Sequence, residues 1–167
     1  MKNSRSGFTL IELVVVALIM GIMAAMAIPM YLKTVETTKA GDAVSIGHML
    51  ASSYRLYLVD NPALPLSGPL NNKCNSQACG TASTRPPCKL VACSYVAKQD
   101  WDKSSYTFEI GGGAAGVLAT IKRRYGTVSP ATTNKAFINW GYTFNDMASG
   151  GSGCTALTTD TPPCPNF

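Results

Sequence analysis

Charge is scarce in this sequence, and one long stretch has none. Charged residues make up 14% of the 167 residues, and no charged side chain occurs between Leu13 and Leu32. Histidine occurs once, as His48. The sequence offers no nucleophile with a histidine base, no paired carboxylates in a shared context and no metal-binding cluster outside the cysteines. We therefore expect a protein that is not an enzyme, and we interpret His48 as a surface or boundary residue.

A dense basic region is also missing. The chain has 14 Lys and Arg residues against 9 Asp and Glu residues, a formal net charge of +5. This mild excess is not what a dedicated nucleic-acid binder shows. Lys122-Arg123-Arg124-Tyr125 is the only basic run next to an aromatic residue. We interpret it as a solvated strand face, with DNA binding as the weaker alternative.

The uncharged stretch has the length of a membrane span. Twenty residues of helix rise about 30 Å, the thickness of the hydrocarbon core of a bilayer. Lys2 and Arg5 precede the stretch, which predicts a cytoplasmic N-terminus with the bulk of the chain outside. An ordinary signal peptide cleaved at Ala25-Met26-Ala27 and a plain signal anchor are the alternative interpretations.

One carboxylate, Glu12, stands just inside the apolar edge. An ionised carboxylate in an apolar environment is costly unless it has a partner, so this residue marks a function. The segment around it, G-F-T-L-I-E-L-V-V-V-A-L-I-M-G-I-M-A-A-M-A-I-P at residues 7–29, resembles the N-terminus of type IV pilins and of type II secretion pseudopilins. The resemblance covers roughly the first third of the chain. The positions that carry it are Gly7, Phe8, Glu12, Gly21, Pro29 and Tyr31.

The resemblance implies a processing and assembly pathway. Residues 1–7 would be a leader that prepilin peptidase removes after Gly7, with methylation of the new amine on Phe8. Residues 8–32 would hold the precursor in the bacterial inner membrane until assembly machinery extracts it. Glu12 would pair with the Phe8 amine of a neighbouring subunit and set the register of a homo-oligomeric helical filament.

Residues from Phe8 to about Asp60 are expected to form one long helix. Its first half is apolar all round, whereas residues 33–60 are amphipathic. Gly21 and Pro29 mark a weak segment, because a proline inside a helix costs about 3 kcal/mol. We expect this segment to be helical in the membrane and unwound in the polymer. The predicted buried stripe of the second half is Ala43, Ile46, Leu50, either Ser53 or Tyr54, and Tyr57.

All six cysteines lie beyond residue 73, and an even number outside the cytoplasm predicts disulfides. Four of them lie in a long connection over residues 61–105, where residues 90–97 are expected to form a short strand. These four can pair in three ways, and we prefer the local pairs Cys74–Cys79 and Cys88–Cys93. A zinc site made of the four thiolates is the less favoured alternative.

Period-two alternation predicts an antiparallel meander of three to four strands over residues 106–145. Residues 106–110 and 117–124 are two of its strands, and the run Ile138, Trp140, Tyr142 and Phe144 marks a third. Gly111-Gly112-Gly113 is interpreted as a hairpin turn, since neither a helix nor a Lys-Ser/Thr pair follows as a phosphate-binding loop requires. The expected fold is α+β, with the sheet covering the helix stripe in a globular domain over residues 33–167.

Cys154 and Cys164 bracket a polar loop in the last segment, residues 146–167. The pilin resemblance implies a disulfide between them that closes this loop onto the sheet. Major pseudopilins tend to bind calcium in this region, but Asp160 is the one carboxylate between the two cysteines, too few for a calcium cage. We therefore expect no metal and no cofactor.

The sequence predicts a type IV pilus subunit that ends as an extracellular filament. A type II secretion pseudopilin and a minor tip pilin acting as an adhesin or DNA-binding module are the alternatives.

Overall fold

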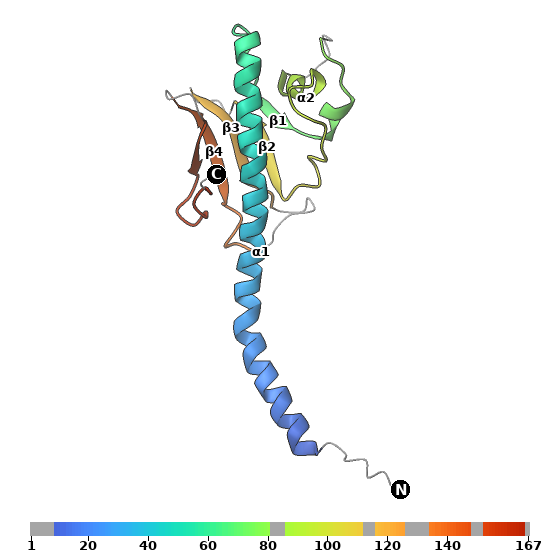
Figure 1. The fold of residues 1–167 in the computed structure, drawn as a ribbon, viewed down its shortest axis with the longest axis vertical. Helices are drawn as coiled ribbons and strands as arrows, with labels where there is room; N and C mark the ends of the chain where they lie inside the picture. Colours follow the sequence, from blue (N-terminus) through green and yellow to red (C-terminus); the bar gives the residue numbers. More distant parts are fainter. Residues whose placement is uncertain (1–8, 81–85, 112–115, 126–133, 148–151, 166–167) are drawn as a thin grey trace, which may run out of the picture. The chain divides into compact units, whose positions relative to one another are not determined.

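The computed structural model describes residues 9–80, 86–111, 116–125, 134–147 and 152–165. The chain divides into two compact units, Met1–Thr37 and Thr38–Phe167. Figure 1 shows the fold as a ribbon coloured along the sequence. The helices are α1 (Leu10–Asp60), the 3-10 helices η1 (Asn72–Ser76) and η2 (Pro86–Cys88), and α2 (Lys89–Ala92). The strands are β1 (Gly68–Leu70), which precedes η1, and β2 (Tyr106–Ile110), β3 (Val117–Arg123), β4 (Gly141–Asp146) and β5 (Ser152–Ala156), which follow α2.

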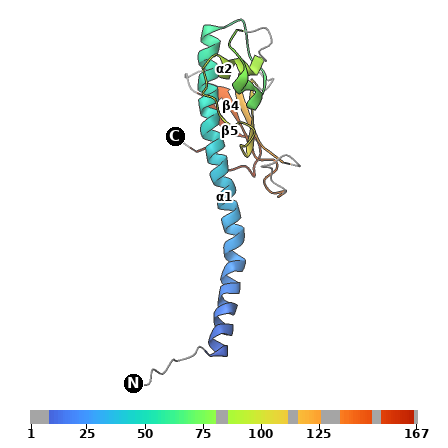
Figure 2. The ribbon, with the colours of Figure 1, turned by 90° about the vertical axis from the view of Figure 1, so that its right-hand side faces the viewer.

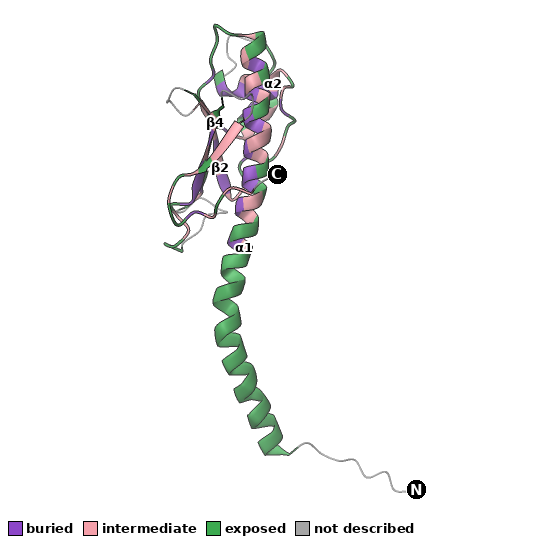
Figure 3. Ribbon diagram, turned by 60° about the vertical axis from the view of Figure 1, so that its left-hand side comes forward, coloured by how far each residue is buried: buried purple, intermediate pink, exposed green. Residues whose placement is uncertain are grey.

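The described part of the first unit is helical from Leu10 onward. The helix runs through Gly21 and Pro29 without a break. Its side chains from Leu10 to Thr34 are exposed on every side, as the green colouring in Figure 3 shows. The segment is thus helical in this structure, and both its helical state in a membrane and its unwound state in a polymer stay predictions.

The second unit contains a five-stranded antiparallel sheet in the order β1-β2-β3-β4-β5. Every strand pairs with its sequence neighbour, for example Phe108 with Ile121 in β2–β3 and Phe144 with Cys154 in β4–β5. This meander confirms the α+β prediction. It has two more short strands, β1 and β5, than the three runs that the alternation picked out, because the Gly-Pro-Leu and Ser-Gly-Cys-Thr-Ala segments show no apolar alternation.

Alternation predicted the buried faces of β2 and β4, and in β3 it correctly predicted buried Ala119 and Ile121. Tyr106, Phe108 and Ile110 of β2 are all at most 1% exposed. Thr120 and Arg123 of β3 are also buried, although Thr120 was expected on the solvated face and Arg123 belongs to the basic run that we interpreted as solvated. The third predicted run is a strand only from Gly141, since the residues before it form a turn.

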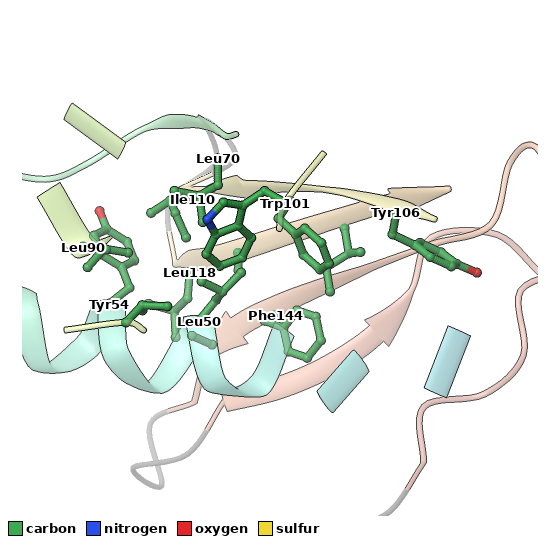
Figure 4. Packing of buried hydrophobic residues seen from close by; sticks show 14 of the residues in the cluster. Leu50, Tyr54, Leu70, Leu90, Trp101, Tyr106, Ile110, Leu118 and Phe144 are labelled. Atoms are coloured by element: carbon green, nitrogen blue, oxygen red, sulfur yellow. The ribbon is translucent and has the colours of Figure 1, made fainter. Parts of the chain in front are cut away.

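The C-terminal half of α1 lies against one face of this sheet (Figures 1 and 2). Four of the five positions in the predicted stripe are buried, with Tyr54 rather than Ser53 at the fourth, and Ile46 packs against them at the edge of the core. Figure 4 shows Leu50 and Tyr54 pointing from the helix toward Leu118, Ile110 and Phe144 on the strands.

The helix is held to the following connection by a tyrosine. The Tyr54 hydroxyl donates to the Leu66 carbonyl oxygen and accepts from the Leu66 N–H, both at 2.9 Å. All three groups are buried. A single side chain therefore satisfies the backbone of the residue that leads into β1.

We expect Tyr54→Phe to lower the free energy of unfolding by about 2 kcal/mol, because it leaves a buried N–H and a buried C=O without their partner. Leu58→Ala, which trims a half-buried aliphatic side chain one turn further on, is the matched comparison for plain loss of packing. Urea unfolding followed by tryptophan fluorescence measures both. A Tyr54→Phe protein as stable as the parent would contradict the importance of this hydroxyl.

The connection over residues 61–105 is folded differently from our prediction. Residues 89–92 form the short helix α2 and residues 93–97 are in no strand, so the predicted strand at residues 90–97 is wrong. Leu90, Val91 and Val96 are nevertheless buried in the core. These residues are apolar because they are buried in a short helix and the turn after it. From the sequence alone, a short apolar run of this kind cannot be told from a buried strand.

The preferred disulfide pairing is also wrong. The structure joins Cys74 to Cys88 and Cys79 to Cys93, with 14 residues of separation in each case. η1 packs against α2, and this brings the segment that carries Cys74 and Cys79 opposite the segment that carries Cys88 and Cys93. Since all four sulfurs are in disulfides, the zinc alternative is excluded as well.

Candidate functional site

The first candidate site lies at the N-terminal end of α1. Gly7 and Phe8, the expected cleavage junction, lie outside the described residues. The first described residue, Thr9, caps the helix: its hydroxyl oxygen accepts a long hydrogen bond of 3.4 Å from the Glu12 N–H. In return, Glu12 Oε2 accepts from the Thr9 N–H at 2.9 Å and from the Thr9 hydroxyl at 2.7 Å. This reciprocal arrangement is a capping box.

The capping box gives Glu12 a local partner that our sequence reasoning overlooked. Its signal was present, since Thr9-x-x-Glu12 before an apolar run matches the motif. Both bonds from Thr9 end on Oε2. The same carboxylate can therefore keep the cap and offer Oε1 to a cationic donor from outside the helix.

The apolar surface behind Glu12 is the second feature of this site. Within the described residues, α1 is the one helix long and apolar enough to cross a membrane, and none of its most apolar window is buried. Leu10, Met20, Met26 and Met30 are each more than 60% exposed. A helix that is apolar all round is stable only inside lipid or among other apolar helices.

His48 is a boundary residue, as we predicted. It is half-buried, its ring meets Phe144 edge-on with centroids 4.9 Å apart, and its Nδ1 lies 3.3 Å from the Ser152 hydroxyl. A cleft of about 730 Å³ opens beside it, next to the Cys154–Cys164 bridge, and among the described residues that line this cleft His48 is the one with a titratable side chain. In the described part of the chain, no group of three potential metal ligands comes together.

The basic run on β3 is not a continuous cationic surface. Lys122 is exposed, but its Nζ lies 3.8 Å from a Glu109 carboxylate oxygen on β2. Arg123 is only 4% exposed, and its guanidinium donates to the Ser105 carbonyl oxygen at 2.6 Å. The interpretation of the whole run as a solvated face is therefore wrong for Arg123. The same burial removes the central cation from the DNA-binding alternative.

The C-terminal segment is fastened to the sheet. Cys154 of β5 is bonded to Cys164, the pair that the resemblance implied. Thr161 is buried, and its hydroxyl oxygen accepts from the Gly141 N–H at 3.4 Å, at the start of β4. The bridge holds the last described residues against β5, and the Thr161 contact holds them against the start of β4.

Comparison with known proteins agrees with this geometry. Residues 2–28 match the prokaryotic N-terminal methylation motif. The type IV major fimbrial protein FimA of Dichelobacter nodosus is 32% identical over 125 residues, which cover 70% of this chain and 73% of that protein. Another FimA of that species is 43% identical over 61 residues, 36% of each chain.

A second class of protein matches a shorter part of the chain. The type II secretion system core protein G of Pseudomonas aeruginosa is 36% identical over 64 residues, 38% of this chain and 45% of that protein. No solved structure matches the chain significantly. The similarity to fimbrial subunits thus extends well beyond the N-terminal helix, whereas the match to the secretion protein is limited to less than half of each chain.

Proposed function

The chain belongs to the type IV pilin family, and from this premise we propose that it is the structural subunit of a type IV pilus filament. Its precursor is held in the bacterial inner membrane with the N-terminus in the cytoplasm. Prepilin peptidase removes residues 1–7 after Gly7, and Phe8 is methylated. Membrane-embedded assembly machinery then moves the mature subunit from the lipid into an extracellular homopolymer.

The observation that carries this proposal is the fully exposed apolar half of α1. Burial of apolar surface contributes about 25 cal/mol per Å². Moving a helix with twenty uncharged, fully exposed residues from the bilayer into water would lose this contribution over its whole apolar surface, so the helix cannot leave the lipid for water. It can leave if the same helices of neighbouring subunits cover it, so lipid and a filament core are the two environments that fit this one surface.

Glu12 supplies the register in this proposal. A carboxylate and an ammonium group about 4 Å apart attract by on the order of 4 kcal/mol at an effective dielectric near 20. Oε2 is engaged by Thr9, and the carboxylate can take the Phe8 amine of the adjacent subunit on Oε1. The pairing neutralises both charges in an apolar core, and a subunit placed one step too high or low forms no such pair.

A pilus subunit is favoured over a pseudopilin by the extent of the fimbrial match and by the C-terminal bridge. The fimbrial relative is matched over 73% of its length, the secretion protein over 45% of its own. A disulfide stands in the loop where, by the resemblance, a major pseudopilin tends to bind calcium. Adhesion and twitching motility are tasks such a filament can serve.

Mass spectrometry of filaments sheared from the cell surface tests the proposal. We expect the chain to be abundant in this material, to begin at Phe8 and to carry one methyl group on its amine. An N-terminus at Ile28, after Ala25-Met26-Ala27, would mean that the apolar helix had been removed as a signal peptide, and it would overturn the proposal. Retention of the chain in the cell envelope with Met1 intact would equally contradict it.

A further inference from the structure

The two interleaved disulfides differ sharply in their access to solvent. Cys74 and Cys88 are each 0% exposed. Cys79, in contrast, is exposed and Cys93 is half-buried. A thiolate can attack a disulfide only where it can approach a sulfur atom along the bond. The two bridges therefore have the same loop length but opposite accessibility.

The accessible bridge borders a surface cleft of about 380 Å³. Both cysteines line this cleft, together with Tyr57, Tyr95 and Lys89. Lys89 begins α2, and its carbonyl oxygen accepts from the Cys93 N–H at 2.9 Å, one helical turn later. Lys89 also lines the cleft, so the surroundings of the Cys79–Cys93 bridge include one positively charged residue. A nearby cation favours the thiolate form of a cysteine.

We propose that Cys79–Cys93 is a thiol–disulfide exchange site, and that its reaction partner is a dithiol. One thiolate of the dithiol attacks the exposed Sγ of Cys79, and the Cys79–Cys93 bond breaks as the mixed disulfide forms. The Cys93 sulfur leaves as a thiolate into the cleft that Lys89 also lines. The second thiolate of the dithiol then attacks its own partner sulfur in the mixed disulfide and releases Cys79 as a thiolate.

The electrons balance in this exchange. The dithiol loses two electrons and becomes a disulfide, while Cys79 and Cys93 gain them and each take up a proton. Run in reverse with an oxidised dithiol protein, the same steps close the bridge. The redox state of the surroundings thus decides whether the Cys79–Cys93 bridge on the surface of the folded subunit is open or closed.

The surrounding segment is held independently of this bridge. The Asn72 amide donates to Asp100 at 2.7 Å, and this bond, together with Lys103, lowers the pKa of the Asp100 carboxyl. The Asn75 amide donates to the Gln99 carbonyl oxygen, also at 2.7 Å. With Cys74–Cys88 closed as well, η1 stays tied to residues 99–102 when Cys79–Cys93 opens. Opening is therefore local.

Differential alkylation of the native full-length protein in detergent micelles tests the site. The protein is incubated with dithiothreitol for increasing times, quenched with iodoacetamide and mapped by mass spectrometry. We expect Cys79 and Cys93 to be labelled at least about tenfold faster than Cys74 and Cys88, because the latter are sealed in the core. They should also be labelled before Cys154 and Cys164, which are half-buried. Equal rates for the three bridges, or earlier labelling of either other bridge, would overturn the proposal.

Two sets of variants complete the test. Lys89→Met keeps the aliphatic stem and removes the charge, and it should slow opening of Cys79–Cys93 about threefold, because the leaving thiolate loses its cation. Lys98→Met, an exposed lysine that does not line the cleft, should leave the rate unchanged. The double variant Cys79→Ser, Cys93→Ser should keep the near-ultraviolet circular dichroism of the parent. An unaltered rate in Lys89→Met would refute the role of the lysine, and loss of the dichroism in the double variant would refute local opening.

Discussion

Replacing Gly47 with alanine is expected to destabilise the globular unit by about 2 kcal/mol, a large effect for one methyl group. Gly47 lies on the face of α1 that meets the sheet. A Cβ atom there would be 2.3 Å from the Phe144 ring and 2.5 Å from the end of the Ile121 side chain. Both side chains are 0% exposed, so neither has space into which to move. The added methyl group must push the helix away from β3 and β4.

Gly41 provides the matched control six residues earlier in the same helix. A Cβ atom at Gly41 would meet nothing within 4 Å. Gly41→Ala should therefore raise stability by about 0.5–1 kcal/mol, the usual gain from replacing a helical glycine. The two substitutions remove the same backbone freedom from the unfolded chain, and only the packing at the sheet differs.

Thermal unfolding of both variants, followed by near-ultraviolet circular dichroism of the buried tryptophans Trp101 and Trp140, measures the two effects with opposite signs. For a unit of this size, 2 kcal/mol corresponds to a fall in Tm of about 8 °C. If the Tm of Gly47→Ala were as high as that of Gly41→Ala, and thus above that of the parent, the helix would not lie as close to the sheet as it does in the structure.

The fold could be predicted from the sequence in segments whose apolar residues recur with a single helical or strand period. The helix stripe from Ala43 to Tyr57 and the alternation of Tyr106, Phe108 and Ile110 each reflect a single buried face. Arg123 follows Ile121 by two residues and so has the buried parity of β3, but its charge led us to interpret it as solvated. Its guanidinium donates to the Ser105 carbonyl oxygen and lies over the Tyr106 ring at 5.6 Å, and these partners cannot be identified from the sequence.

The disulfide pairing could not be predicted for a similar reason. Spacing makes Cys74 and Cys79 neighbours in sequence, but pairing depends on which segments pack together. Leu90 and Val91 of α2 are buried in the core, where α2 packs against η1, and the hydrogen bonds of Asn72 and Asn75 tie η1 to Asp100 and Gln99. None of these interactions is visible before the connection is folded.

The N-terminal site differs from Arg123 and from the disulfides. Its residues were identified through the resemblance to pilins, but the capping box between Thr9 and Glu12 was not predicted. Glu12 was predicted from its isolated charge in an apolar run. The structure adds that Thr9 binds the same carboxylate through two hydrogen bonds. Two roles, a helix cap and a partner for a neighbouring amine, therefore meet at one side chain, and substitutions can separate them.

Glu12→Ala should abolish filaments, and Glu12→Gln should come close to doing so. Glutamine keeps the capping box, because its amide oxygen accepts from the Thr9 N–H as the carboxylate does. It removes the charge, and with it an attraction on the order of 4 kcal/mol, or about a thousandfold in the equilibrium for adding a subunit. Thr9→Ala has the opposite effect: it weakens the cap by about 1 kcal/mol and keeps the charge, so we expect it to retain filaments.

The yield of sheared surface filaments, normalised to the cellular level of mature subunit, measures the three variants. Leader removal, seen as a mass shift, is the internal control, and it should proceed in all of them because the carboxylate has no part in cleaving the bond after Gly7. If Glu12→Gln restored normal yield while Glu12→Ala did not, the cap rather than the charge would be what assembly requires. Normal yield from Glu12→Ala would remove this residue from the assembly mechanism altogether, since neither the cap nor the ion pair survives that change.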